Sequence, residues 1–279
     1  MTTVWEKLSL PRVCGLLAER PTTLSAAMHS AGFSALALPF VYSPFAVTDV
    51  KQPIAEMRQK GYRGYSVTIP FKESVMPLLD SISTEASEIG AVNTVINDGK
   101  QLVGYNTDLF GIVEALKEAA FELANKRVIV LGAGGAARAA VLACKKLGAA
   151  SVMISNRDER RAKGLADIFH LSTLPLKELE PALLSCDLLV NCTPLGSQPQ
   201  DTLGSYPFAL TALPKSCAVF DLVTRDTLLT TTASAVGADV ITGPQMLLFQ
   251  ALQQFRLFTE VEPPKAVMEA ALKQELAKI

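Results

Sequence analysis

Over the first hundred residues, apolar positions follow two different spacings, one typical of strands and one typical of helices. Short apolar runs predict strands at residues 13–17 and 64–69, and apolar positions at helical spacing predict a helix over residues 24–31. Two further runs, residues 91–96 and 101–105, flank an Asp-Gly pair that favours a tight turn, and they predict a hairpin. Alternating strands and helices indicate a mostly parallel α/β sheet.

Over residues 109–244, the alternation of predicted strands and helices becomes more regular. Apolar strands are predicted at residues 128–131, 151–155, 188–191, 218–222 and 239–241, with helices at residues 136–147 and 160–169. This order is typical of a doubly wound α/β domain.

The remaining residues, 245–279, are helical in pattern and are interrupted at Pro263 and Pro264. A helical tail has to bury its apolar side, and we expect it to pack on the first segment. The sequence therefore predicts one domain made of residues 1–108 and completed by residues 245–279, with residues 109–244 as a second domain inserted between them.

Length and charge fit this organisation and restrict the partners. A chain of 279 residues is long enough for about two domains. Its 26 Lys and Arg residues nearly balance 27 Asp and Glu residues, so we expect no nucleic acid partner. The apolar runs are far shorter than the roughly 20 residues of a membrane span. Residues 1–10 lack the apolar core of a secretory signal, and a cytoplasmic protein is expected.

Cysteine and histidine usage predicts neither disulfides nor a metal site. The five cysteines are an odd number and are scattered without metal-ligand spacing, so we expect small core residues. The two histidines, His29 and His170, are expected to be ordinary, partly exposed residues without a catalytic role.

The segment VIVLGAGGAAR places a strand, a glycine turn and a helix start in immediate succession. Gly132 allows the tight turn, Gly134 lets a pyrophosphate approach the backbone, and Ala137 permits close packing of helix on strand. The first N–H groups of the helix then face the phosphates. This arrangement predicts a dinucleotide site, although a glycine turn that serves packing alone has the same local pattern.

The choice between NAD and NADP depends on the segment SNRDERR after the next strand. Asn156, Arg157 and Arg161 are suited to hold a 2′-phosphate, which favours NADP. Asp158 and Glu159 are suited to accept a ribose hydroxyl, so NAD remains possible. A solvated charge run that opens a helix is the alternative interpretation.

Candidate acid–base residues lie in the segments SVTIPFKE and GYNTD. Hydride transfer between an alcohol and a nicotinamide needs a group that exchanges the hydroxyl proton, and no histidine is suitably placed. Lys72 is a candidate for this proton transfer, and Asp108 is a candidate to orient Lys72 and to bind the hydroxyl. From spacing alone, a lysine after Pro-Phe is as readily a surface residue.

Seven motifs occur in an order that resembles the shikimate dehydrogenase family, and they span nearly the whole chain. They are VTIPFKE, GAVNT, YNTD, GAGGAAR, NRDERR, NCTPLG and GPQMLLFQALQQF. The resemblance implies an α/β fold of two domains. Residues 1–108 with 245–279 would form the substrate-binding domain, and residues 109–244 a Rossmann-type NADP-binding domain.

The resemblance also implies roles for individual residues, with Lys72 and Asp108 as the catalytic pair. The implied substrate-binding residues are Thr23, Ser25, Thr68, Asn93 and Gln250. The implied cofactor-binding residues are Gly132, Ala133, Gly134, Gly135, Ala136, Asn156, Arg157, Arg161, Thr193, Leu222 and Gly243. No metal is implied.

Several positions depart from the family pattern. The Ser-x-Ser that holds the substrate carboxylate in the family corresponds to Thr23 and Ser25. Ser66 replaces an asparagine, and Thr224 replaces a substrate-contacting tyrosine. These changes are typical of the shikimate/quinate dehydrogenase-like branch, whose members need not serve the aromatic pathway. Arg20 is either a new carboxylate contact or a surface arginine.

The resemblance therefore implies an NADP-dependent oxidoreductase that reversibly reduces 3-dehydroshikimate, or a close analogue, to shikimate in the chorismate pathway of aromatic amino acid biosynthesis. A dehydrogenase of quinate or another cyclic hydroxy acid, using NAD or NADP, is the alternative within the same class. A non-catalytic, cofactor-binding regulatory protein is the alternative of another class. We expect a monomer or homodimer with a small-molecule substrate.

Overall fold

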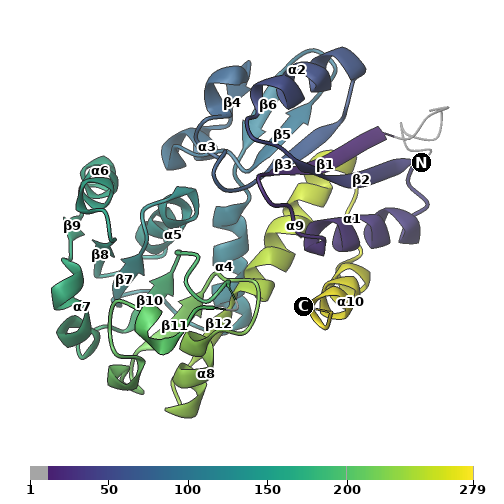
Figure 1. Ribbon diagram of the computed structural model, residues 1–279. Coiled ribbons are helices and arrows are strands. Elements are labelled where there is room, and N and C mark those ends of the chain that lie inside the picture. Colours follow the sequence, from purple (N-terminus) through teal and green to yellow (C-terminus); the bar gives the residue numbers. More distant parts are fainter. Residues whose placement is uncertain (1–11, 199, 279) are drawn as a thin grey trace. The chain divides into compact units, whose positions relative to one another are not determined.

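The computed structural model describes residues 12–198 and 200–278, which divide into two compact units (Figure 1). The first unit holds the described residues up to Phe110 and from Gln250 onward, and the second holds residues Gly111–Phe249. The limits fall within two helices, α4 (Asp108–Glu118) and α9 (Gly243–Thr259). Each unit has its own sheet and its own core.

The sheet of the first unit has six strands in the order β2-β1-β3-β5-β6-β4. The strands are β1 (Arg12–Ala18), β2 (Phe40–Ala46), β3 (Gly64–Val67), β4 (Ser81–Ile82), β5 (Thr94–Asn97) and β6 (Leu102–Tyr105). β1 is parallel to β2 and β3, whereas β5 is antiparallel to β3 and β6. The predicted hairpin is confirmed, and Asp98 closes its turn by accepting 2.8 Å hydrogen bonds from the backbone N–H groups of Lys100 and Gln101.

Helices cover this sheet and extend the unit. They are α1 (Leu24–Ala35), α2 (Lys51–Lys60), the 3₁₀ turn η2 (Met76–Leu78), α3 (Thr84–Ile89) and α10 (Lys265–Leu276). α10 packs along α1, as Figure 1 shows, so two helices far apart in the sequence lie side by side. The predicted interruption at the two prolines is confirmed, because α9 ends at Thr259 and α10 begins at Lys265.

A buried arginine links the end of α9 to the sheet of the first unit through hydrogen bonds. Arg63, which precedes β3 and is 5% exposed, donates hydrogen bonds to the carbonyls of Phe258 (2.8 Å), Leu257 (3.0 Å) and Asn97 (2.9 Å). The last carbonyls of a helix have no partner within the helix, and a cation there is favoured by the helix dipole. Arg63 therefore fixes the part of α9 that follows Gln250.

His29 corrects the expectation that both histidines are partly exposed. Its side chain is fully buried and stacks on Tyr42, with ring centroids 4.5 Å apart. Burial lowers the pKa of His29 to about 3, so this core imidazole is neutral. His170 is exposed and ends a helix in the left-handed conformation, with φ 55°.

The sheet of the second unit has six parallel strands in the order β12-β11-β10-β7-β8-β9. They are β7 (Arg127–Leu131), β8 (Ser151–Ser155), β9 (Ser172–Thr173), β10 (Leu188–Asn191), β11 (Ala218–Asp221) and β12 (Val240–Thr242). The doubly wound prediction is confirmed. Pairing register brings five residues to one level near the carboxyl ends of their strands: Ser155, Leu131, Asn191, Asp221 and Thr242.

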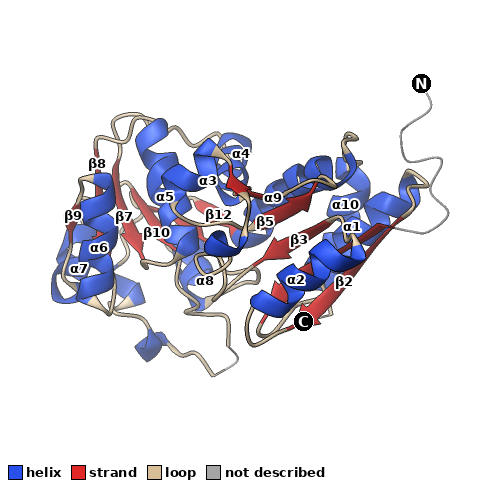
Figure 2. Ribbon diagram, turned by 90° about the horizontal axis from the view of Figure 1, so that it is seen from above, coloured by secondary structure: helices blue, strands red, loops and turns tan. Residues whose placement is uncertain are grey.

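Helices flank this parallel sheet, as Figure 2 shows. They are α5 (Gly135–Lys146), α6 (Glu159–Phe169), α7 (Leu176–Leu183), α8 (Leu228–Ala235) and the 3₁₀ turns η3 (Leu203–Ser205) and η4 (Leu210–Ala212). α5 packs on β7 and β8, α6 on β8 and β9, and α8 on β11 and β12. None of the helices that the structure describes is both long enough and apolar enough to span a membrane.

Candidate active site

A lysine and an aspartate form an ion pair in the first unit. Lys72 follows β3, Asp108 is the first residue of α4, and Lys72 Nζ donates to Asp108 Oδ2. The two side chains are only 12% and 5% exposed, so little solvent screens the pair. The N-terminus of a helix favours a carboxylate, and the backbone N–H of Asp108 is capped by Asn106 at 2.9 Å. The structure brings together the two residues predicted to be the catalytic pair.

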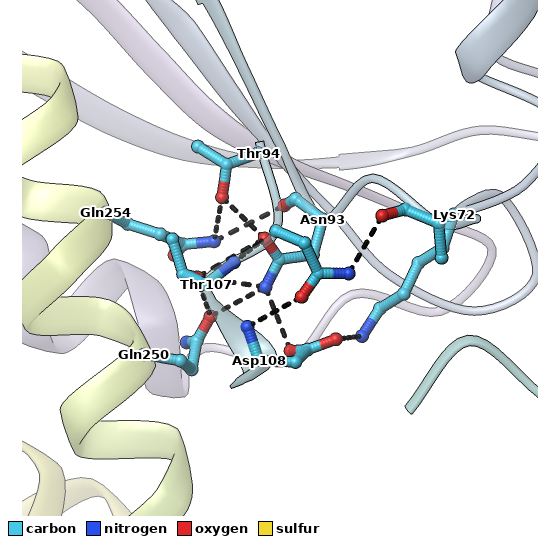
Figure 3. Close-up of polar contacts among 9 residues, drawn as sticks. Lys72, Asn93, Thr94, Thr107, Asp108, Gln250 and Gln254 are labelled. Carbon is cyan, nitrogen blue, oxygen red and sulfur yellow. Dashed lines mark hydrogen bonds and ion pairs between the residues drawn. The ribbon is translucent and has the colours of Figure 1, made fainter. Parts of the chain in front are cut away.

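Asn93 holds the other oxygen of the same carboxylate (Figure 3). It is 2% exposed and immediately precedes β5, and its Nδ2 donates to Asp108 Oδ1 at 2.9 Å. Both oxygens of Asp108 therefore have a donor. A carboxylate held in this way cannot rotate without losing one of the two contacts.

The amide of Asn93 has a fixed orientation. Its Oδ1 accepts hydrogen bonds from the backbone N–H of Thr107 (2.8 Å) and from Thr94 Oγ1 (2.8 Å). A backbone N–H is always a donor, so Oδ1 must face Thr107 and Nδ2 must face Asp108. The backbone N–H of Thr107 thus determines which group of Asn93 meets the carboxylate of Asp108.

Helix α9 contributes two glutamines one turn apart, and both point into this cluster (Figure 3). Gln250 Oε1 lies 3.2 Å from Thr107 Oγ1 and 3.4 Å from Asn93 Nδ2. Gln254 Nε2 donates to Thr94 Oγ1 at 2.9 Å, and Gln254 Oε1 accepts from Ser66 Oγ at 2.9 Å. Gln254 was missed by the sequence analysis, although its spacing from Gln250 places both on one helix face.

The polar network continues beyond Gln254 toward β2. Ser66 lies in β3 and receives a 2.7 Å hydrogen bond from the hydroxyl of Tyr42. Tyr42, Ser66 and Gln254 are all buried, and burial raises the pKa of Tyr42, so the phenol stays protonated. Ser66 is the residue that departs from the family pattern, and here its hydroxyl is paired on both sides.

The remaining predicted substrate residues have separate environments in the first unit. Thr23 precedes α1, is exposed, and donates from Oγ1 to Glu275 Oε1 of α10 at 2.5 Å. Ser25 is buried in the first turn of α1, and Thr68 is half-buried after β3. Arg20 is exposed. No hydrogen bond described for this unit joins Thr23, Ser25 or Thr68 to the Lys72–Asp108 pair.

The glycine turn of the second unit has the geometry that the sequence predicts. Gly132 follows β7 with φ +117°, a conformation that side chains disfavour, and its N–H donates to the carbonyl of Ser155 at 2.8 Å. Gly134 immediately precedes α5, which has no side-chain cap, and a Cβ at Gly134 would meet nothing within 4 Å. Ala133, Gly135 and Ala136 lie within the same turn. Open space over uncapped N–H groups fits a bound pyrophosphate.

In the segment after β8, one acidic side chain caps a helix, whereas the basic side chains are exposed. Asp158 caps α6, because its Oδ1 accepts from the backbone N–H groups of Arg160 (3.0 Å) and Arg161 (3.3 Å). Asn156 is half-buried and donates from Nδ2 to the Asp158 carbonyl at 2.9 Å. Arg157 and Arg161 are exposed and form no ion pair within residues 12–198 and 200–278. Asp158, a candidate acceptor for a ribose hydroxyl, is therefore already engaged by the start of α6. The guanidinium groups of Arg157 and Arg161 are available to a 2′-phosphate.

Three further predicted cofactor residues follow β10, β11 and β12. Thr193 donates from Oγ1 to Asn191 Oδ1 at 2.6 Å, and the N–H of Leu222 donates to the Asn191 carbonyl at 3.0 Å. At Gly243, an added Cβ would lie 2.2 Å from the carbonyl oxygen of Val223, so only glycine permits this approach. Thr224, which replaces the family tyrosine, is half-buried in the segment after Leu222.

The cysteines are mostly buried, and the acidic and thiol groups form no metal centre in the described residues. Cys14, Cys144, Cys186 and Cys217 are buried free thiols, as predicted for core residues, and Cys192 is partly exposed. No group of three His, Cys, Asp or Glu side chains able to hold a metal ion occurs in the part of the chain that the structure describes.

Three family models match successive parts of the chain. Residues 21–95 match the shikimate dehydrogenase substrate binding domain, residues 114–199 match shikimate / quinate 5-dehydrogenase, and residues 243–273 match the shikimate 5'-dehydrogenase C-terminal domain. Together they cover most of the described residues of both units.

Individual relatives agree with the family models. The chain is 38% identical over 260 residues to shikimate dehydrogenase (NADP(+)) of Carboxydothermus hydrogenoformans, covering 90% of this chain and 92% of the relative. The structure of shikimate 5-dehydrogenase of Thermus thermophilus with NADP(H) and shikimate aligns with TM-score 0.83 and 35% identity, covering 96% of this chain and 100% of that one. Quinate dehydrogenase of Corynebacterium glutamicum with NAD aligns with TM-score 0.87 and 29% identity, covering 95% and 99%.

Proposed function

The chain belongs to the shikimate dehydrogenase family, and we propose on this basis that it reversibly reduces 3-dehydroshikimate to shikimate with NADPH. The single observation that carries the proposal is the buried Lys72–Asp108 ion pair, with Asn93 on the second carboxylate oxygen. A cyclic ketone that becomes an alcohol needs one hydride on carbon and one proton on oxygen.

Lys72 supplies the proton. In the reducing direction its ammonium group donates a hydrogen bond and then a proton to the carbonyl oxygen, as the charge on that oxygen grows. In the oxidising direction the neutral amine takes the proton of the hydroxyl group. NADPH, when bound, provides the hydride, and no residue of this chain changes its oxidation state.

Asp108 orients Lys72 and binds the substrate hydroxyl. The Asn93 amide, which Thr107 and Thr94 hold in one orientation, keeps the carboxylate directed at the lysine. This preorganisation supports proton transfer, because the donor and its partner need no rearrangement during the reaction.

The substrate-binding roles rest on the family pattern together with the residues present. Thr23 and Ser25 would bind the substrate carboxylate through their hydroxyl groups, and Thr68, Asn93 and Gln250 would bind ring hydroxyls. Asn93 and Gln250 already reach the catalytic cluster, which supports their roles. Thr23 already donates to a carboxylate, that of Glu275, which supports its role in binding the substrate carboxylate. The substrate would replace Glu275 as the acceptor of this hydrogen bond.

NADP is the cofactor, and the residues present fit it. The uncapped start of α5 with Gly132 to Ala136 would hold the pyrophosphate, and Asn156, Arg157 and Arg161 would hold the 2′-phosphate. Thr193, Leu222 and Gly243, which follow the strands on the other side of β7, would contact the nicotinamide half. NAD use at lower affinity is compatible with this site, since Glu159 remains exposed.

Turnover of shikimate and quinate, each with NADP⁺ and NAD⁺, tests the proposal. We expect shikimate with NADP⁺ to give the highest kcat/KM. Quinate is the second candidate, because Thr224 replaces a substrate-contacting tyrosine and a quinate dehydrogenase aligns over 95% of this chain. Turnover of quinate without shikimate would replace the first proposal by the second. Cofactor binding without turnover of any cyclic hydroxy acid would favour a regulatory protein.

We also infer a cytoplasmic monomer or homodimer without a nucleic acid partner. The five free cysteines support a reducing compartment, and the net charge of −1 gives no basic surface excess. Light scattering of the purified chain at several concentrations measures the oligomeric state.

A further inference from the structure

A buried carboxylate in the second unit connects three loop segments. Asp221 ends β11 and is fully buried, and its Oδ1 accepts from Asn191 Nδ2 at 2.9 Å and from the backbone N–H of Val223 at 3.1 Å. Its Oδ2 accepts from Thr227 Oγ1, just before α8, at 2.7 Å. No cation forms an ion pair with this carboxylate among the described residues.

The partners of Asp221 carry predicted cofactor contacts. Asn191 Oδ1 accepts from both the N–H (3.1 Å) and the hydroxyl (2.6 Å) of Thr193, so the amide that Asp221 orients also positions Thr193. Leu222 lies between Asp221 and Val223, and the Val223 carbonyl is the atom that Gly243 approaches. Thr193 is therefore one hydrogen bond and Leu222 one residue from the Asp221 network, and Gly243 approaches closely the carbonyl of Val223, which belongs to it.

All three positions follow β10, β11 and β12, on the opposite side of β7 from the basic segment after β8. In a doubly wound sheet the two halves of a dinucleotide lie on opposite sides of the central glycine turn. A group that orders the loops after β10 and β11 therefore acts on the half that carries the nicotinamide.

We propose that Asp221 is a positioning residue that holds the segments after β10 and β11 in the conformation that binds the nicotinamide half of NADP. This inference rests on the proposed function only in that the chain binds NADP. The carboxylate itself is buried inside the unit, so its role would be indirect. A buried carboxylate without a cation is costly in a protein core, and burial raises the pKa of Asp221 to about 6. The three donors that Asp221 orders explain why a carboxylate lies at this position.

Two ligands separate this role from a general effect on the fold. NADP⁺ has the nicotinamide, whereas 2′-phospho-ADP-ribose has the same adenine half and pyrophosphate without it. In Asp221→Ala the donors of Asn191, Val223 and Thr227 lose their acceptor. We expect the Kd of NADP⁺ to rise about tenfold, as for the loss of about one hydrogen-bonded contact, and the Kd of 2′-phospho-ADP-ribose to stay within twofold.

Three variants complete the experiment. Asp221→Asn keeps an acceptor for Asn191 and Val223 and can donate to Thr227, so it should bind NADP⁺ within about twofold of the unaltered chain. Thr227→Val removes one donor and should weaken NADP⁺ by a few fold, which provides a test if Asp221→Ala does not fold. Asp187→Ala is the matched control, because Asp187, just before β10, accepts from the backbone N–H (2.7 Å) and Nε (3.0 Å) of Arg127 and has no contact with Asn191, Asp221 or Thr227.

Isothermal titration calorimetry of each variant with both ligands gives the result. Selective loss of NADP⁺ affinity in Asp221→Ala, restored in Asp221→Asn and absent in Asp187→Ala, supports the role of Asp221. Equal losses for both ligands, no loss, or the same selective loss in Asp187→Ala overturns it. Failure of the unaltered chain to bind NADP⁺ would contradict the proposed function itself.

Discussion

Asn93 Nδ2 lies 2.9 Å from Asp108 Oδ1, while Lys72 holds the other oxygen of that carboxylate. The asparagine is fixed by a backbone N–H and a hydroxyl, so its amide nitrogen is a permanent donor to Asp108. Lys72 is therefore positioned by a chain of contacts that begins at Asn93, just before β5.

Asn93→Asp tests the donor role of this amide. The new carboxylate would lie at hydrogen-bond distance from Asp108, and two such groups share a proton. A shared proton restores a donor to Asp108, so kcat of the variant, relative to the unaltered chain, should rise as the pH falls from about 8 to about 6. The pH profile of kcat measures this, and parallel profiles would refute the donor role.

Arg157→Ala tests the 2′-phosphate site. A charge-assisted hydrogen bond contributes about 1.5 to 3 kcal/mol, so the Kd of NADP⁺ should rise roughly 10- to 100-fold. The Kd of NAD⁺ should hardly change, because NAD⁺ has no 2′-phosphate. Arg160→Ala, at an exposed arginine in the first turn of α6, is the control. Similar losses for both cofactors would remove the argument for this site.

Asp221 makes stability depend on pH. Its pKa rises from 3.8 to about 6 on folding, so the folded state holds the proton more tightly. The stabilisation from this proton is fully present below pH 3.8 and is lost as the pH rises through about 6. Asp221→Asn mimics the protonated form.

The free energy of unfolding of Asp221→Asn and of the unaltered chain should therefore be similar near pH 4. At pH 7 the variant should be the more stable, by at most about 3 kcal/mol for a shift of roughly two pKa units. Urea unfolding at both pH values measures the difference. A difference that does not change with pH would show that Asp221 ionises at its ordinary pKa.

Glu275 competes for Thr23, since the Thr23 hydroxyl has one proton and donates it to Glu275 Oε1 at 2.5 Å. A substrate carboxylate that needs this proton must displace Glu275 and also approach its negative charge. We expect Glu275→Gln to lower the KM of shikimate a few fold while kcat stays constant. Glu269→Gln, on the same helix and paired with Lys273, is the control. An unchanged or higher KM would exclude this competition.

Local signals explain what the sequence predicted well. The glycine turn at Gly132, the β5–β6 hairpin and the parallel strands of the second unit each depend on neighbouring residues, and all are present. β2 was missed because Pro44 interrupts its pattern, and proline is tolerated there because β2 is an edge strand. β4, with two residues, has too short a pattern to detect.

The candidate site was less predictable where it depends on packing. The sequence suggested Lys72 and Asp108 but could not show that both are buried against each other. Gln254 and Asp221 were missed because a glutamine in a helix and an aspartate at a strand end are usually exposed. His29 was placed wrongly, since only the packing of α1 on β2 and α9 encloses its ring.

NADPH formation from shikimate, measured for the unaltered chain and for Lys72→Met, tests the proposed activity and the role of Lys72 together. The unaltered chain should reduce NADP⁺ with shikimate. Lys72→Met keeps the length of the side chain without its proton, and kcat should fall roughly 10²- to 10⁴-fold. Lys51→Met, at an exposed lysine of α2, should retain full activity. Absence of shikimate turnover by the unaltered chain, or unreduced turnover by Lys72→Met, would contradict the account.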